Sequence, residues 1–108
     1  MIRGASLGGR ENVATRIYEK EMGITHGEFF RLLAFALGTD QYSRGTNSAS
    51  LQNVDKSVEI KLGPEGIRQI ALLVVPTTPV ELTLGGFSDA EAEKFMVKFD
   101  RAYQRGGG

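Results

Sequence analysis

The chain has 108 residues, of which 41% are hydrophobic and 24% are charged, and this ordinary globular composition excludes disorder along the whole length. Its 13 basic and 13 acidic residues cancel, so the chain lacks the overall positive charge that attracts nucleic acids. The absence of cysteine excludes disulfide bonds and thiolate chemistry.

Both ends of the chain are rich in glycine. Residues 1–10 show no hydrophobic periodicity, so we expect a flexible leader before a single domain over residues 11–105. The glycines of residues 106–108 predict a flexible tail. The sequence contains no run near the roughly 20 apolar residues that a membrane-spanning helix needs, and no signal-peptide core precedes the domain. We therefore expect a cytoplasmic protein without membrane association.

Two helices are predicted in the first forty residues. Hydrophobic residues recur at helical spacing in residues 12–22, which predicts a first helix. Thr25 and Glu28 form a capping-box pattern ahead of an apolar run, which predicts a second helix over residues 26–37 that ends at Gly38. Because the connection between them is short, we expect the two helices to form an αα-hairpin.

Strand patterns dominate the middle of the chain. The polar segment 39–53 is expected to be a long loop, with a candidate fourth strand at residues 49–51. Apolar and polar side chains alternate strictly in residues 57–62 and again in residues 80–84, which predicts two half-buried strands. Residues 67–75 are apolar on both faces from Ile70 onward, as in a central strand, and residues 76–79, which hold two prolines, are expected to break this strand. Short connections between these segments predict an antiparallel meander.

A second capping box, Ser88 and Glu91, predicts a C-terminal helix that starts at Asp89. One face of this helix is apolar: Ala92, Phe95, Met96, Phe99, Ala102 and Tyr103. The predicted fold class is therefore α+β. We expect a two-layer sandwich of a three-stranded or four-stranded antiparallel meander, an N-terminal αα-hairpin and a C-terminal amphipathic helix.

Few residues point to chemistry. His26 is the only histidine, and its expected place at a helix start favours a structural role. The sequence assigns no catalytic residue, no metal ligand and no cofactor, because it contains none of the standard zinc, calcium or nucleotide motifs. Charged side chains at the ends of the predicted elements form a candidate binding rim for an anion: His26, Arg44, Glu65, Arg68 and Arg101.

The apolar surplus of this short chain favours a protein-interaction or assembly domain that self-associates, with an unidentified protein as a further partner. The candidate interface residues are Phe30, Phe35, Leu73 and Val75. One alternative is a small-molecule or anion-binding domain that uses the charged rim. Another is a weak nucleic-acid adaptor that uses isolated Arg-Gly pairs such as Arg44-Gly45, a reading that the balanced charge disfavours.

Overall fold

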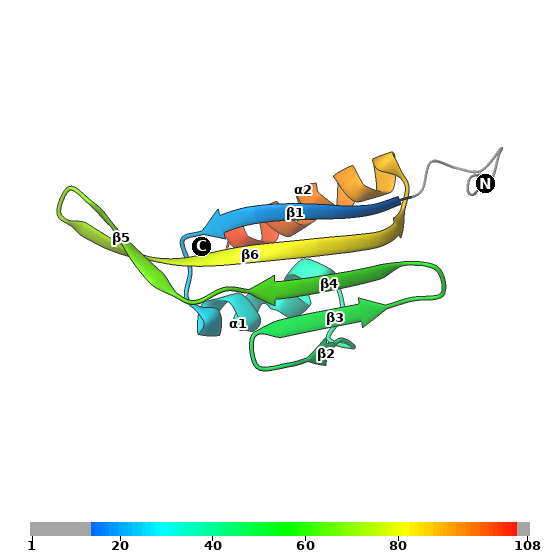
Figure 1. The fold of residues 1–108 in the computed structure, drawn as a ribbon, viewed down its shortest axis with the longest axis horizontal. Coiled ribbons are helices and arrows are strands. Elements are labelled where there is room, and N and C mark those ends of the chain that lie inside the picture. Colours follow the sequence, from blue (N-terminus) through cyan, green and yellow to red (C-terminus); the bar gives the residue numbers. More distant parts are fainter. Residues whose placement is uncertain (1–13, 106–108) are drawn as a thin grey trace.

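The computed structural model describes residues 14–105, which form a six-stranded antiparallel sheet and two α-helices (Figure 1). In chain order the elements are β1 (Ala14–Met22), α1 (His26–Leu37), β2 (Ser43–Arg44), β3 (Ser48–Gln52), β4 (Ser57–Leu62), β5 (Gly66–Ile70), β6 (Leu73–Phe87) and α2 (Asp89–Arg105). The prediction of an α+β fold with an antiparallel sheet is confirmed.

Helix α1 has the predicted bounds because its two ends are capped. The Thr25 hydroxyl accepts a hydrogen bond from the Glu28 backbone N–H at 3.1 Å, which satisfies one of the free donors of the first turn. Gly38 ends the helix in the left-handed conformation, at φ 77°, where its N–H bonds to the Ala34 and Phe35 carbonyls.

Helix α2 also begins where the sequence predicts. The Ser88 N–H donates to the Glu91 carboxylate at 2.9 Å, and the Glu91 N–H donates back to the Ser88 hydroxyl at 3.2 Å. This reciprocal pair is a complete capping box. The apolar face of α2 is buried or half-buried against the sheet and α1, as the sequence pattern predicts.

The strands of the sheet are ordered β1-β6-β4-β3-β2, and β5 pairs with the first part of β6. In β4 the predicted alternation is confirmed: Val58, Ile60 and Leu62 are buried, whereas Glu59 and Lys61 are exposed. Both helices cover one face of the sheet and leave the other face open (Figure 1). The core therefore lies between the sheet and a single helical layer.

Aromatic rings fill the space where α1 meets α2. The rings of Phe29 and Tyr103 stack with centroids 5.0 Å apart, and Phe99 lies 4.9 Å from Tyr103. All three side chains are almost fully buried. The Tyr103 hydroxyl donates to the Phe29 carbonyl at 2.8 Å, so the one polar atom of this cluster has a partner.

The prediction of a helix in residues 12–22 is wrong, and with it the αα-hairpin. Residues 14–22 form β1, which pairs with β6 along its length. Side chains that face the helical layer alternate with exposed ones, but two of the inward positions are Arg16 and Lys20. Arg16 pairs with Asp89 at 2.6 Å and Lys20 with Asp100 at 2.7 Å, both on α2. Because the inward side chains are charged, the sequence did not show the alternation of a strand.

The prediction of a central strand over residues 67–75 is wrong at both ends. The predicted meander is not confirmed either, because residues 57–62 pair directly with residues 80–85 of β6. Residues 67–75 do not form one strand, because the chain reverses at Ala71 and Leu72 between β5 and β6. Strand β6 then continues through Pro76 and Pro79, where a break was expected. Pro79 lies one residue beyond the last β4 pair, Leu62↔Val80, so its missing N–H falls where that ladder ends.

The loop at residues 39–53 contains β2 and β3, so a strand does run through residues 49–51, and the sheet has six strands rather than three or four. The expected leader, residues 1–10, and the expected tail, residues 106–108, lie outside the described residues. Among residues 14–105, no helix is both long enough and apolar enough to cross a membrane.

Candidate functional site

The most distinctive surface is a two-stranded hairpin, residues 66–77, which we call the arm. It consists of β5 and the first part of β6, paired from Gly66↔Thr77 to Ile70↔Leu73, and it projects beyond the end of the sheet (Figure 1). The described part of the molecule is elongated as a result, with extents of 55 × 28 × 24 Å. Its radius of gyration is 15.9 Å, against about 13 Å for a compact domain of about 100 residues.

The arm exposes large apolar side chains on both of its faces. The exposed fractions are 74% for Ile67, 52% for Ile70, 95% for Leu72, 65% for Leu73 and 60% for Val74. Arg68 is the only charged residue among the twelve residues of the arm. Natural edge strands usually carry charged side chains that prevent association, and the arm carries only this one.

The turn at the tip of the arm is strained. Ala71 adopts φ 54°, a left-handed conformation in which its Cβ crowds the backbone at a cost of about 1 kcal/mol. Glycine or asparagine is the usual residue at such a position. The turn therefore presents Leu72 at the tip without the polar residues that hairpin turns normally show to water.

Four side chains hold the base of the arm against the body. The His26 backbone N–H donates to the Glu65 carboxylate at 2.8 Å, and the His26 ring nitrogen Nε2 donates to the Gly63 carbonyl at 2.7 Å. Arg68 forms an ion pair with Glu21 on β1. Three of the predicted rim residues are thus brought to one place, where they bind other groups of the chain.

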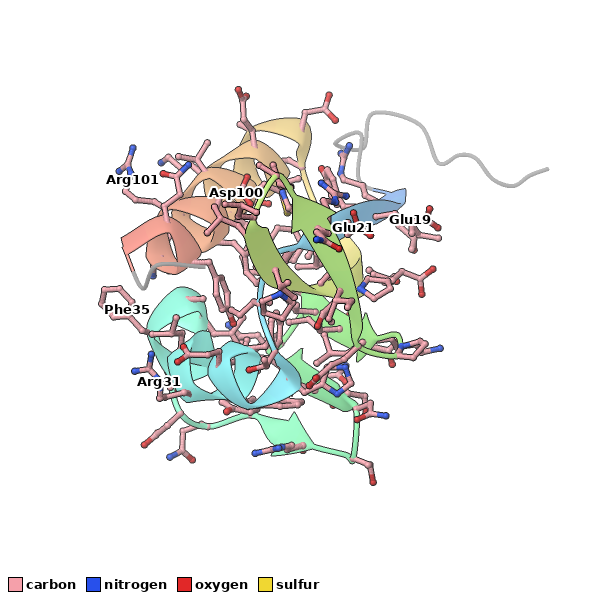
Figure 2. The ribbon with its side chains drawn as sticks, turned by 90° about the vertical axis from the view of Figure 1, so that its left-hand side faces the viewer. Glu19, Glu21, Arg31, Phe35, Asp100 and Arg101 are labelled. Atoms are coloured by element: carbon pink, nitrogen blue, oxygen red, sulfur yellow. The ribbon has the colours of Figure 1, made fainter. Side chains whose placement is uncertain are left out.

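A second surface feature is a groove of about 920 Å³ along the outer side of the helical layer. Phe35 of α1 is 56% exposed and Val97 of α2 is 48% exposed, and both line it. Lys94, Lys98 and Arg101 also line it. In Figure 2, Phe35 and Arg101 lie on the same side of the molecule, and Glu19 and Glu21 of β1 lie on the other.

The predicted site residues do not form one rim. His26, Glu65 and Arg68 lie at the base of the arm, whereas Arg101 lies in the groove. The Arg44 guanidinium lies 3.7 Å from the centroid of the Phe30 ring, at the edge of α1.

The candidate interface residues also separate into three places. Leu73 and Val75 belong to the arm, and Phe35 belongs to the groove. Phe30 is only 8% exposed and packs in the core. The exposed side chains of Ile67, Ile70, Leu72, Val74 and Val97 were not singled out from the sequence. The low charge of residues 66–77 is the sequence signal that could have indicated the four exposed residues of the arm.

Two titratable groups in the described part of the chain have a shifted pKa. Burial, with a smaller contribution from Tyr42, raises the pKa of Tyr103 far above its usual value. The hydrogen bond from the Ser88 backbone N–H, followed by that from Lys56, lowers the pKa of Glu91. Both shifts arise from groups that hold the fold together. Within residues 14–105, no cluster of three or more histidine, aspartate or glutamate side chains is arranged to hold a metal ion.

No family model matches the chain, and no curated protein or solved structure matches it either. Function is therefore inferred from the surfaces alone.

Proposed function

We propose that this chain is a protein-interaction domain that self-associates, and that the arm is its contact surface. The observation that carries the proposal is the exposure of Ile67, Ile70, Leu72, Leu73 and Val74, each by half or more. Exposed apolar patches of this kind mark interaction sites on soluble proteins.

The physical state of the arm supports this function. A two-stranded ribbon is marginally stable in water when nothing packs against it. The arm exposes apolar side chains on both faces, and its tip stores the strain of Ala71. A partner that covers the ribbon would bury these side chains and stabilise the hairpin at the same time, at about 1.5–3 kcal/mol for each large side chain fully buried.

Other strand edges of the sheet are less suited to association. The outer edge of β1 carries Glu19 and Glu21, and pairing β1 with its own copy would bring these carboxylates close to one another. At the opposite edge, β2 has only two residues. The arm combines an open edge with an almost uncharged sequence. Because most soluble oligomers are built from copies of one chain, a second copy is the partner that we propose.

The test measures the mass of the full chain by sedimentation equilibrium at tens of micromolar. We expect wild-type protein to exceed the mass of one chain, and the double variant Leu72→Lys/Val74→Lys to dissociate at least about 100-fold more readily. The matched control is Val54→Lys, because Val54 is 97% exposed in the connection between β3 and β4, at the other end of the sheet. This control should associate like the wild type.

A mass equal to a single chain for the wild-type protein at this concentration contradicts the proposal. If that monomer also bound phosphatidylcholine vesicles, and Leu72→Lys/Val74→Lys abolished the binding, the arm would be assigned to a lipid surface instead.

A further inference from the structure

We propose that the arm of one copy docks in the α1–α2 groove of the next copy, so that the chain assembles head to tail. This inference rests on the proposed self-association and names the surface that receives the arm. The arm and the groove are different surfaces of the same chain, so the contact is heterologous rather than two-fold symmetric.

The dimensions of the two surfaces agree. The arm has five residue pairs, and a strand rises about 3.3 Å per residue, so its length is about 17 Å. The groove is lined from Ala90 to Ala102 along α2, and twelve residues at 1.5 Å each span about 18 Å.

The chemistry of the groove fits an apolar ribbon. Phe35 and Val97, both about half exposed, and the half-buried Phe95 supply apolar surface. Charged side chains surround them. An apolar centre with a polar rim is the usual arrangement of a protein interface. The tip of the arm carries no charge, so its docking between these side chains would leave no buried ion without a partner.

Charge complementarity favours the groove over a contact between two arms. The groove is lined by the cations Lys94, Lys98 and Arg101 and by the carboxylates Glu91 and Glu93. Glu91 pairs with Lys56, whereas within residues 14–105 no salt bridge engages the three cations, so positive charge is in excess in the groove. On the open face of the sheet, which continues into one face of the arm, carboxylates outnumber cations: Glu19, Glu21, Glu59 and Glu81 against Lys61 and Arg68.

Arg101 of the groove lies on the opposite side of the molecule from Glu19 and Glu21 of β1 (Figure 2). A symmetric contact of two arms would bring Glu21 and Glu19 of both copies together. Docking in the groove instead sets the acidic side of one copy near Lys94 and Arg101 of another. Like charges held close are unfavourable, and opposite charges at the rim of an interface steer association.

The cysteine-free sequence allows a direct test by engineered disulfides. We would mix full-length Leu72→Cys with full-length Val97→Cys under mild oxidation, since both positions are exposed and tolerate the change. The mixed 72–97 disulfide should form at least about tenfold faster than the 72–72 disulfide. The matched control is Val54→Cys mixed with Leu72→Cys, which should not crosslink above the rate of free collision.

The double variant Leu72→Cys/Val97→Cys should give a ladder of covalent dimers, trimers and larger species, because a heterologous contact propagates. Reversing the groove charges with Lys94→Glu/Arg101→Glu should weaken association at least about tenfold in low salt and leave the circular dichroism spectrum unchanged.

The results separate this inference from the proposed function. A 72–72 disulfide that forms faster than the 72–97 disulfide, with association unaffected by Lys94→Glu/Arg101→Glu, would overturn docking in the groove and leave self-association through the arm intact. A wild-type mass equal to one chain by sedimentation would overturn both.

Discussion

Tyr103 illustrates how a single buried hydroxyl makes stability depend on pH. Its O–H donates to the Phe29 carbonyl inside the aromatic cluster, and burial raises its pKa well above the usual value of 10.0. In the unfolded chain Tyr103 ionises near pH 10, whereas in the folded chain it keeps its proton. Folded protein therefore binds more protons above pH 10, and its stability falls as the pH rises.

We predict that the free energy of unfolding falls by about 1.4 kcal/mol per pH unit above pH 10 because of Tyr103, and that Tyr103→Phe removes this dependence. At pH 7 the same variant should lose about 1 kcal/mol, the net contribution of one hydrogen bond. Urea denaturation followed by circular dichroism measures both. Tyr18→Phe is the control, since within residues 14–105 its hydroxyl has no hydrogen-bond partner; an equal effect there would contradict the prediction.

Gly86 is a position where no side chain fits. Its φ is 79°, and an added Cβ would overlap the Asp55 carbonyl oxygen. We predict that Gly86→Ala lowers the free energy of unfolding by at least ~2 kcal/mol, through backbone strain and the shift of the β3–β4 connection. Thermal or urea unfolding tests this.

Gly27→Ala is the matched control for Gly86. An added Cβ there meets only the Thr25 hydroxyl at 4.0 Å, and Gly27 lies in the first turn of α1. Because alanine favours helix more than glycine does, this control should leave stability unchanged or raise it by up to ~1 kcal/mol. Similar losses in the two variants would count against the account of Gly86.

At the level of whole elements, α2 depends on the capping box at its start. Ser88→Ala should cost about 1 kcal/mol of stability, because it removes the acceptor of the Glu91 N–H. The lowered pKa of Glu91 implies that its stabilising effect is present above pH 4.5 and is lost as the pH falls through the folded pKa.

Glu91→Gln should therefore weaken the pH dependence of unfolding below pH 4.5, as measured by urea titrations at several pH values. The control is Glu93→Gln, two residues later on the exposed side of α2, where no capping bond is present among the described residues. If Glu93→Gln changed the pH dependence of unfolding below pH 4.5 as much as Glu91→Gln does, the capping account would be wrong.

The elements that could be predicted from sequence are those whose signals are local. Both capped helices follow from side chains within one turn of their ends, and β4 follows from strict alternation. Strand β1 could not be predicted, because its inward residues Arg16 and Lys20 are explained only by Asp89 and Asp100 of α2, some 70 to 80 positions later in the chain. Because the residues that neutralise Arg16 and Lys20 lie so far along the chain, the sequence around β1 does not show the hydrophobic alternation of a strand.

The arm could not be predicted because its turn has no sequence signal. Its turn contains neither glycine nor asparagine, so the reversal at Ala71 and Leu72 carries no turn signal. The apolar character of residues 67–75 was recognised, but it was attributed to a buried central strand. A continuous run of apolar residues looks the same in the sequence whether the chain's own fold buries it or a partner covers it. The apolar surplus could therefore be recognised from the sequence, while the surface that exposes it required the three-dimensional structure.

The molecule as a whole has two regions of unequal stability. The sheet–helix body encloses the aromatic cluster, whereas none of the buried residues belongs to the arm. Amide hydrogen exchange should therefore show protection in β4 that approaches the global unfolding free energy, about 5–15 kcal/mol, and little protection in β5 at low protein concentration.

If the chain associates through the arm as proposed, raising the protein concentration to tens of micromolar should slow exchange in β5 and leave the amides around Val54 unprotected. Strong protection of β5 in a chain shown to be monomeric would contradict the assignment of the arm as a surface that needs a partner.

Strand β6 gives this molecule a mechanical property. Its 15 residues run from the tip of the arm through the middle of the sheet, where β1 and β4 flank it on both sides. A pulling force on the tip travels along one unbroken backbone into the centre of the body. Both flanking ladders of hydrogen bonds must then shear together before β6 can slide, so a domain joined to others through its arm would resist tension along that axis.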